Sequence, residues 1–244
     1  MGPTVRLVDA HVSGWHSAGP SDWQSVLLML EDLGTESAGA TECLEWVESL
    51  TAWRQYLPPG PTAAECTVLW RADRFRRSAS GTSWLTRKTF RTGSGHVRPG
   101  VVATWVLLTD RDTDQRLLRL VAHLPASVQD GDRFSRDQAA RVAAWVAALD
   151  GLRATLKRLT MDLDPDMVVV SCDWNVDVAR LHWRTLINTA LRPVGLRLSI
   201  PPAGTLHDRR IDAHASRRRG HVRVLPKRKP FDHRPVLTVF SGAR

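Results

Sequence analysis

Two short segments in the last third of the chain carry residue types that hold metal ions and move protons. Asp173 and Asn175 follow the β-branched run at 167–172, so we expect them at the C-terminal end of a buried strand, where open α/β folds place ligands. Asp232 and His233 stand just before the predicted last strand. A carboxylate is a hard ligand suited to magnesium, and an imidazole can act as a base near neutral pH. Each pair alone is more often a turn or a structural feature, but together they predict a site.

Five motifs lie in an order that resembles a known superfamily. CDWN (172–175), RID (210–212) and FDHRPV (231–236) are similar to the GDxN, (R/K)xD and SDHxPV motifs of the endonuclease/exonuclease/phosphatase superfamily, which includes deoxyribonuclease I. AHLPA (122–126) resembles its HL segment, and TEC (41–43) resembles the QE that ends its second strand. The resemblance spans nearly the whole chain. It implies a divalent-metal-dependent phosphoesterase, a hydrolase that acts on phosphate ester bonds.

The resemblance also implies a metal site that uses Mg²⁺ or Mn²⁺. Glu42 would be the principal ligand, with Asp232 close to it. Asp173 and Asn175 would complete the site through the metal, its waters or the phosphate. A cation on the non-bridging oxygens is what phosphoryl displacement needs.

Two histidines and one more carboxylate take the remaining roles that the resemblance implies. His233, oriented by Asp212, would face the scissile phosphate opposite the attacking water, and His123 would stabilise the phosphate or act as a second acid. His11 stands at the end of the first predicted strand, where the family has Asn. An imidazole cannot make the donor and acceptor contacts of an amide in the same geometry, so His11 is a possible site residue that differs from the family.

The net charge of +9 is concentrated in one part of the chain. Residues 209–229 contain nine Lys and Arg and one acidic residue, Asp212. A block of this density attracts phosphate-bearing polymers, although a solvated loop is the plain alternative. We therefore expect a basic hairpin and loop at 209–230 beside the site. The residues expected to contact the substrate are Arg210, Arg217, Arg218, Arg219 and Trp174, with Trp15 as a further candidate.

The composition is that of an ordinary globular protein. The chain has 244 residues, of which 43% are hydrophobic and 24% charged, and we expect residues 1–244 to form a single domain. The apolar runs are far shorter than the roughly 20 residues that span a bilayer, and the N-terminus has no signal-peptide pattern. Three cysteines without a CxxC pair argue against disulfides and zinc and favour a reducing compartment. A cytoplasmic monomer that does not bind membranes is the prediction.

The hydrophobic pattern mixes hairpins with strand-helix-strand units. It predicts an α/β (α+β) fold, a four-layer sandwich of two packed mixed β-sheets flanked by helices. A helical stretch is expected to reach about Gln55, and Asp177 is expected to cap a helix that ends before Pro193. Residues 80–100 form a polar, Gly-containing stretch whose middle, 84–91, could pair as another strand. The other expected helices cover 21–33 and 135–160. The expected strands are 4–11, 38–43, 66–71, 75–79, 101–109, 115–123, 167–172, 196–200, 210–216, 221–225 and 236–240.

Three functions are compatible with these residues. The first is a magnesium-dependent nuclease that cuts phosphodiester bonds by in-line attack of water, with DNA rather than RNA as the expected partner. The second is a phosphatase or phospholipase of the same fold that acts on a small or lipid phosphate and does not require so many cations. The third is a non-catalytic nucleic-acid-binding relative, suggested by His11 in the place of Asn. The position of the basic block favours the nuclease.

Overall fold

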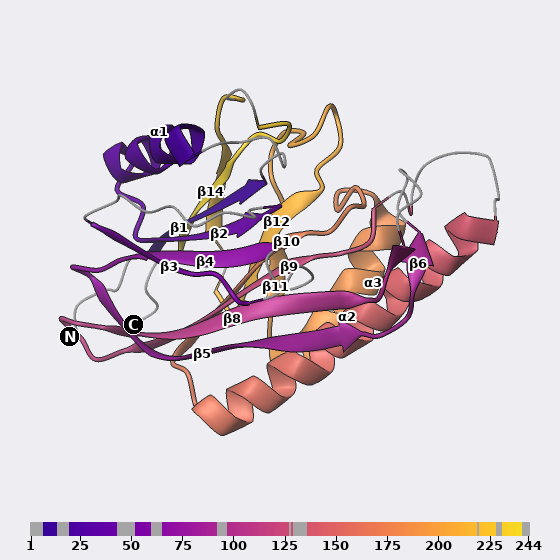
Figure 1. Cartoon of the computed structure of the whole chain (residues 1–244), viewed down its shortest axis with the longest axis horizontal. Helices are drawn as coiled ribbons and strands as arrows, with labels where there is room; N and C mark the ends of the chain where they lie inside the picture. Colours follow the sequence, from indigo (N-terminus) through magenta and orange to yellow (C-terminus); the bar gives the residue numbers. More distant parts are fainter. Residues whose placement is uncertain are drawn as a thin grey trace.

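The computed structural model describes residues 7–13, 20–42, 52–59, 65–91, 97–126, 128, 136–218, 220–227 and 231–240. Two of the predicted substrate contacts, Trp15 and Arg219, lie outside these ranges. Two six-stranded sheets pack against each other, and helices cover both outer faces (Figure 1). Within the described ranges, no helix has the length and apolar character that crossing a bilayer would require.

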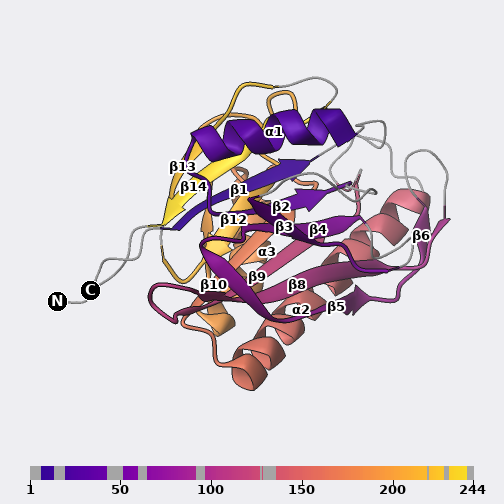
Figure 2. The ribbon, with the colours of Figure 1, turned by 60° about the vertical axis from the view of Figure 1, so that its left-hand side comes forward.

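The first sheet has the strand order β13-β14-β1-β2-β4-β3. β1 and β2 are parallel, and the other neighbours in this sheet are antiparallel. Helix α1 (Pro20–Asp32) crosses the outer face of this sheet (Figure 2). The strands are β1 (Leu7–Ser13), β2 (Ser37–Thr41), β3 (Trp53–Tyr56), β4 (Cys66–Arg71), β13 (Gly220–Val224) and β14 (Val236–Phe240).

The second sheet has the strand order β11-β12-β10-β9-β8-β5, with β9 and β10 parallel. The long helix α2 (Arg136–Leu163) and the shorter α3 (Leu181–Leu191) cover its outer face, and a 3-10 turn (Arg192–Val194) follows α3. A separate pair, β6 (Phe90–Arg91) and β7 (Val97–Arg98), lies beside α2. The strands are β5 (Phe75–Thr86), β8 (Val101–Asp110), β9 (Arg116–His123), β10 (Met167–Asp173), β11 (Arg197–Ser199) and β12 (Asp212–Ser216).

Apolar residues at helix and strand periods explain the four layers. On α1, Val26, Leu27 and Leu30 form one buried face against the first sheet. Trp145 on α2 is fully buried against the second sheet, and burial of a side chain of this size contributes at least about 2 kcal/mol. Val121 belongs to a third cluster between the two sheets. The predicted four-layer sandwich of two mixed sheets flanked by helices is confirmed.

Two local predictions were wrong, and one strand is longer than expected. Residues 53–56 form a strand and not the end of a helix, because Trp53 and Gln55 alternate with exposed Arg54 and pair with β4. The strand predicted at 75–79 continues as β5 to Thr86 along β8, with two register shifts, so it includes the start of the possible strand at 84–91. Asp177 does not cap α3 directly. Its carboxylate accepts the backbone N–H groups of Ala179 and Arg210, and α3 begins after Arg180 without a side-chain cap.

Candidate active site

Three neighbouring strands of the second sheet bring three site residues together. Asp173 is the last residue of β10, and its register partners are His123 on β9 and Asp212 on β12. These residues are far apart in the sequence, but they occupy adjacent positions across one end of the sheet. His123 Nε2 lies 3.7 Å from Asp173 Oδ2. We name this end of the sandwich the site end.

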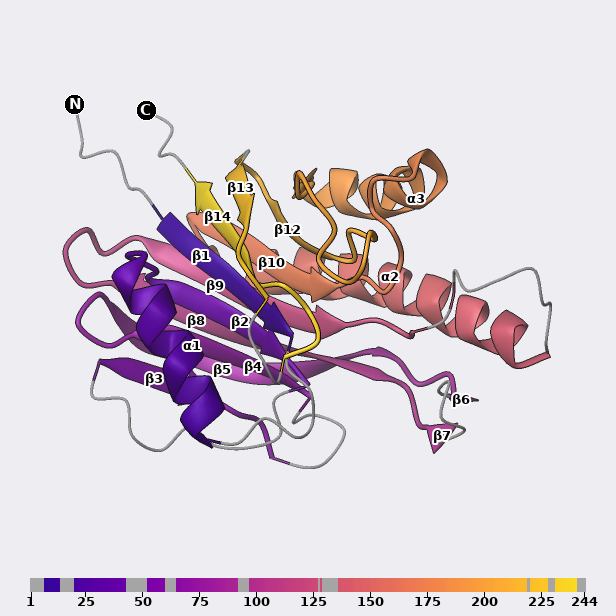
Figure 3. The same ribbon diagram turned by 90° about the horizontal axis from the view of Figure 1, so that it is seen from above.

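The first sheet contributes its residues from the same end. β1 and β10 run in the same direction (Figure 3), and β2 is parallel to β1. Glu42 directly follows β2, while Asp232 and His233 stand just before the first residue of β14. Val236, which opens β14, pairs with His11 near the end of β1. Strand ends from both sheets therefore meet at the site end.

A buried ion pair joins the two sheets at the site end. His233 Nδ1 lies 2.8 Å from Asp212 Oδ2 and 3.8 Å from Asp173 Oδ2. Burial disfavours the imidazolium, but the charge of Asp212 outweighs it and raises the pKa of His233 to about 10. Burial also opposes ionisation of Asp212, and His233 overcomes this effect and holds the Asp212 pKa well below its usual range. At neutral pH the pair is therefore an imidazolium and a carboxylate.

The two residues beside this pair shift towards their neutral forms. Burial, reinforced by the negative charge of Asp212, raises the pKa of Asp173 well above its ordinary value. Burial and the positive charge of His233 lower the pKa of His123 to about 3. His123 is therefore a neutral imidazole at physiological pH, and Asp173 is a carboxyl group that holds a proton more tightly than a free one.

His11 lies behind Asp212 and does not line the site cavity. Its side chain is fully buried, and its Nε2 lies 3.1 Å from Asp212 Oδ1. Asp212 is therefore held between two imidazoles, those of His11 and His233. The ring of His214 meets His11 edge-on at 6.4 Å between centroids. The possible first-strand site residue thus contacts the Asp212 carboxylate and has no surface for a substrate.

The CDWN loop alternates between the site and the core. Asn175 has a positive φ of 54°, its N–H donates to Asp173 Oδ1 at 2.9 Å, and its Nδ2 donates to the Leu124 carbonyl at 2.8 Å. Trp174 points the other way, is fully buried, and donates from Nε1 to the Ala213 carbonyl at 3.3 Å. The predicted contact of Trp174 with substrate was therefore wrong, because its indole packs in the core beneath the loop.

A cavity of about 300 Å³ opens over these groups. Its walls include residues that the sequence did not single out, namely Glu65, Phe90, Arg98 and Leu206. Arg98 pairs with Glu65 in this wall, and its positive charge acts to lower the pKa of Glu42. The predicted site residues that line the cavity are Glu42, His123, Asp173, Asn175, Asp232 and His233. Arg98 and Glu65 come from segments with no motif, so no sequence signal marks them.

The outer wall of the cavity holds negative charge that no described group neutralises fully. Burial, and next the negative charge of Asp232, raises the pKa of Glu42 to about 7. Asp232 Oδ1 is buried without a hydrogen-bond partner among the described residues. These two carboxylates fit a divalent cation, which would hold Glu42 ionised and give Asp232 Oδ1 a partner.

A second set of donors can also be considered for a metal ion. Asp173, Asp212 and His233 each offer a ligand atom, and these atoms lie within 4.8 Å of one another. However, His233 and Asp212 already neutralise each other at 2.8 Å. The residues Glu42 and Asp232 therefore fit a cation better. Of the second set, Asp173 resembles Glu42 most, because burial raises the pKa of both.

The basic block does not lie as a whole beside the site. β12 starts at Asp212, and its last residue, Ser216, pairs with Val169, about 14 Å further along the sheet. Arg217 and Arg218 follow Ser216, so they lie at the end opposite the site, and their predicted place beside it was wrong. The chain returns along β13, and Val224 pairs with Val236 near the site end.

Arg210 does lie at the site end, but its side chain is already engaged. Its guanidinium donates to the Pro202 carbonyl at 3.2 Å, and its N–H donates to Asp177 Oδ1 at 3.4 Å. Within the described part of the 209–230 segment, only the two ends flank the site. The hairpin fold separates charges that are continuous in the sequence.

Comparison with known proteins gives matches of structure alone. No family model matches the sequence, and no curated protein matches it. The structure is similar to an endonuclease/exonuclease/phosphatase family protein from Bacteroides thetaiotaomicron, with a TM-score of 0.70 and 16% identity over 99% of this chain and 96% of that chain. It is also similar to a mannosyl-6-phosphatase from the same organism, with a TM-score of 0.70 and 16% identity over 97% of this chain and 100% of that chain.

A third similar structure is that of D. rerio TDP2 in complex with a single-stranded DNA product. The TM-score is 0.62 and the identity 10%, over 96% of this chain and 98% of that chain. All three similarities cover nearly the full length of both proteins. The chain therefore has the fold of the endonuclease/exonuclease/phosphatase superfamily, as its motifs predicted.

Proposed function

We propose that this protein is a divalent-metal-dependent phosphodiesterase that hydrolyses nucleic acids. The observation that carries the proposal is the pairing of His233 with Asp212 at 2.8 Å in a cavity whose other wall holds Glu42 and Asp232. One wall offers a fixed imidazolium and the other a place for a cation. Positive charge from two sides is what a phosphate needs as its displacement begins.

In this proposal, His233 stabilises the phosphate. Its Nδ1–H donates to Asp212, which fixes the orientation of the ring and leaves Nε2, 3.7 Å from Asp232, towards the cavity. Because Asp212 keeps the imidazole protonated, Nε2–H donates to a phosphate oxygen and holds the charge that develops on it. His123, which is neutral, supports the leaving oxygen from the neighbouring strand.

Asp173 is the group that takes the proton of the attacking water. Asp173 accepts this proton in its ionised form, which a cation bound beside it would favour, and its raised pKa makes that form a stronger base than an ordinary carboxylate. The N–H of Asn175 holds its other oxygen in place. Bound by Glu42 and Asp232, Mg²⁺ or Mn²⁺ would supply positive charge against the non-bridging oxygens. The water oxygen bonds to phosphorus as the bond to the leaving oxygen breaks.

A phosphatase that acts on a small phosphate is the second candidate. Two observations favour it: the cavity of about 300 Å³ has the size of a small-molecule site, and Arg217 and Arg218 do not lie beside it. One similar structure is a mannosyl-6-phosphatase. A non-catalytic nucleic-acid binder is the third candidate, because His11, which stands where the family has Asn, contacts Asp212 and does not line the cavity.

One set of assays separates these functions. The purified protein is incubated with plasmid, single-stranded DNA, RNA, a chromogenic phosphodiester, a chromogenic phosphomonoester and a sugar 6-phosphate, each with Mg²⁺, Mn²⁺ or EDTA. We expect the diesters to be cut with metal only. Asp173→Asn should abolish cleavage, while Asp150→Asn, which changes an exposed carboxylate on α2, should not.

Two outcomes would contradict the proposal. Cleavage that continues in EDTA would exclude the metal, and equal activity of Asp173→Asn would exclude its role as the base. Turnover of monoesters without any diester cleavage would establish the phosphatase instead.

A further inference from the structure

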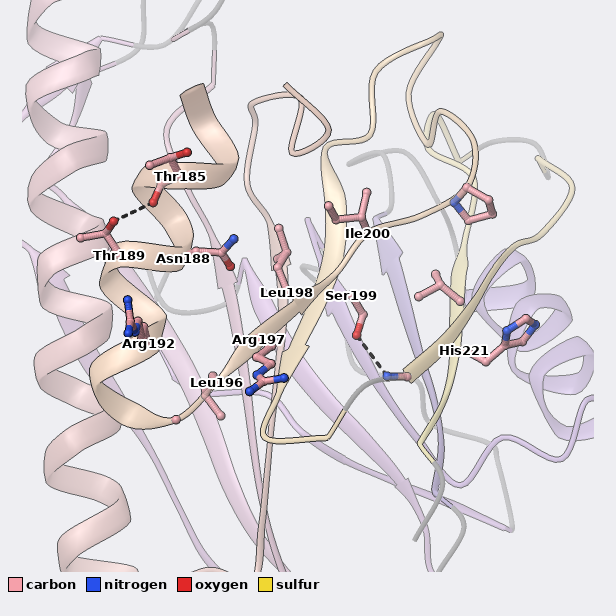
Figure 4. Close-up of a pocket in the computed structure, with 14 residues that line it drawn as sticks. Thr185, Asn188, Thr189, Arg192, Leu196, Arg197, Leu198, Ser199, Ile200 and His221 are labelled. Atoms are coloured by element: carbon pink, nitrogen blue, oxygen red, sulfur yellow. Dashed lines mark hydrogen bonds between the residues drawn. The ribbon is translucent and has the colours of Figure 1, made fainter. Parts of the chain in front are cut away.

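A second and larger groove lies on the edge of the sandwich. It has a volume of about 950 Å³ and is lined by the C-terminal half of α3, by the segment that contains β11, and by the start of β13. Figure 4 shows Asn188 on α3 and Arg192 in the 3-10 turn that follows it, beside Arg197 and Leu198 on β11. β11 and β13 are the edge strands of the two sheets, so the groove follows the open side of the molecule.

The charge of this groove is entirely positive among the described residues. Its lining includes Arg192 and Arg197, both exposed, and the described lining contains no Asp or Glu. Neither guanidinium pairs with a carboxylate of the described chain. Arginines on other faces behave differently, since Arg71 and Arg74, for example, each contact acidic side chains at 2.6 Å.

The turn between β12 and β13, which belongs to the basic block and lies away from the site, adjoins this groove. Register places Arg197 of β11 opposite Ser216, and Arg217 and Arg218 follow directly. Gly220, which ends the same turn, donates its N–H to Ser199 Oγ at 3.4 Å (Figure 4). Four arginines therefore gather at the end of the groove that is far from the site.

The chain itself connects the groove to the site. Ile200 and Pro202 line the groove, and Leu206, a few residues later, lines the site cavity. Between them, Thr205 Oγ1 accepts the N–H of Asp212 at 3.2 Å, which ties this segment to the site. A ligand that follows the segment from Arg197 to Leu206 passes from one cavity to the other.

We infer that this groove binds the sugar-phosphate backbone of the substrate strand several nucleotides away from the bond that is cut. The inference rests on the proposed nuclease function and extends it. Unpaired guanidinium groups bind phosphates, while the apolar side chains of Leu198, Ile200 and Val222 offer contact to sugars. The strand from Asp212 to Ser216 spans about 14 Å, so the far end of the groove lies beyond the reach of the nucleotides at the bond that is cut.

The chemistry favours a nucleic acid over a peptide strand at the β11 edge. An extended peptide would use the backbone groups of the edge strand and pockets for its side chains, and it would not need unpaired arginines. The lining has no aromatic platform for base stacking among the described residues, and the ring of His221 points away from β11 (Figure 4). Binding is therefore expected to be independent of sequence and strongly dependent on salt.

The test compares a long substrate with a minimal one. The double variant Arg192→Ala/Arg197→Ala is assayed for binding of a long fluorescent single-stranded oligonucleotide and for hydrolysis of the chromogenic phosphodiester. We expect Kd for the oligonucleotide to rise about tenfold, and the slope of log Kd against log salt to fall by about 1.4, because each lost phosphate contact accounts for about 0.7. The rate of hydrolysis of the chromogenic diester should not change, because this small substrate occupies only the site cavity and does not reach the groove.

The matched control is Arg76→Ala/Arg77→Ala, which removes two exposed arginines from β5, the opposite edge of the same sheet. An equal loss of binding in this control, or no loss in the groove variant, would overturn the inference. Arg192→Lys/Arg197→Lys keeps the charge and should retain most of the binding. A wild-type protein that binds the oligonucleotide through these arginines but hydrolyses no diester would refute the nuclease and leave the groove established.

Discussion

The pKa values of carboxylates in two parts of the site shift in opposite directions. We call the pair of Asp212 with His233 the inner wall, and the carboxylates Glu42 and Asp232 the outer wall. On the inner wall Asp212 lies between His11 and His233, and its pKa is held well below the usual range. On the outer wall Glu42 is raised to a pKa of about 7, because it is partly buried and faces the negative charge of Asp232. The charge of Asp212 is balanced by His233 within the protein, while in the proposed function a bound cation would balance Glu42 and Asp232. This difference distinguishes Asp212, which orients the His233 ring, from Glu42 and Asp232, which are proposed to bind a cation.

The largest expected effect comes from breaking the inner wall. Asp212→Asn removes the charge that keeps His233 protonated, and it leaves the ring without its fixed orientation. We expect kcat to fall by about 10³-fold, in the range of acid-base groups. The pKa of His233, followed by NMR, should drop well below about 10, because burial lowers it and only the more distant Asp173 and Asp232 still raise it. A His233 pKa that stays near 10 would show that another group holds the proton.

The same pair has a defined pH window for stability. The folded-state pKa of His233 is above its ordinary value of 6.5, so its contribution to the free energy of unfolding is full below about pH 6.5. This contribution is lost as the pH rises through about 10. When thermal unfolding is measured over a series of pH values, Asp212→Asn should not show this loss of stability at alkaline pH.

Breaking the outer wall should lower activity and raise stability. Glu42→Gln removes a metal ligand, and we expect about a 10²-fold loss of kcat/KM at limiting Mg²⁺. Without metal, the folded protein holds a proton on Glu42 that the unfolded chain releases, so stability of the wild type falls between about pH 4.5 and pH 7. The variant should avoid this loss, which amounts to about 3 kcal/mol at pH 8.

Thermal unfolding with and without Mg²⁺ tests whether the outer wall binds the cation. The wild type should gain Tm with Mg²⁺ at pH 8, and Glu42→Gln should not, because a ligand that binds only the folded state stabilises it. Glu36→Gln, which changes a carboxylate outside the cavity, is the control. Equal responses to Mg²⁺ in all three proteins would place the metal elsewhere.

A smaller effect is expected from His11, because it acts on the site only through Asp212. His11→Ala leaves Asp212 Oδ1 buried without its neighbour, which costs about 2 kcal/mol of stability. We expect kcat to fall by about tenfold and KM to stay unchanged, since His11 does not line the cavity. His11→Asn restores an N–H donor and should recover part of both losses. A change confined to KM would mean that His11 reaches the substrate.

The smallest effect on activity is expected from Trp174. Trp174→Phe removes the hydrogen bond to the Ala213 carbonyl and some buried volume, which costs about 1 to 2 kcal/mol in denaturant unfolding. Substrate affinity and kcat should remain those of the wild type. An increase in KM for oligonucleotides, with normal stability, would return Trp174 to the substrate surface.

Periodic elements could be predicted from the sequence, and short or polar ones could not. The run at 167–172 and the hairpin at 101–123 are confirmed as β10, β8 and β9, because their apolar patterns are long and local. Trp53–Tyr56 has four residues, too few for a period to be distinguished from a helix end. β5 carries polar residues up to Thr86, and only its pairing along β8 makes it a strand.

The site divides in a similar way. Motifs named Asp173, Asn175, Asp232 and His233, and these residues do line one cavity. Arg98 and Glu65 join the same cavity from segments without a motif, so their proximity depends on how β7 and β4 pack. The expected substrate contact of Trp174 was wrong because residue spacing does not state which side of a loop a side chain faces.

Residue types and local periodicity were enough to predict the motif residues of the site and the order of the strands that carry them. The protonation states of these residues and the place of the basic block depend on contacts between distant strands, which local patterns do not contain. A pKa depends on burial and on charges from other strands, as with His233 and Asp212. Arg210 and Arg217, which are seven positions apart in the sequence, lie at opposite ends of the sandwich, because β12 carries the chain away from the site between them.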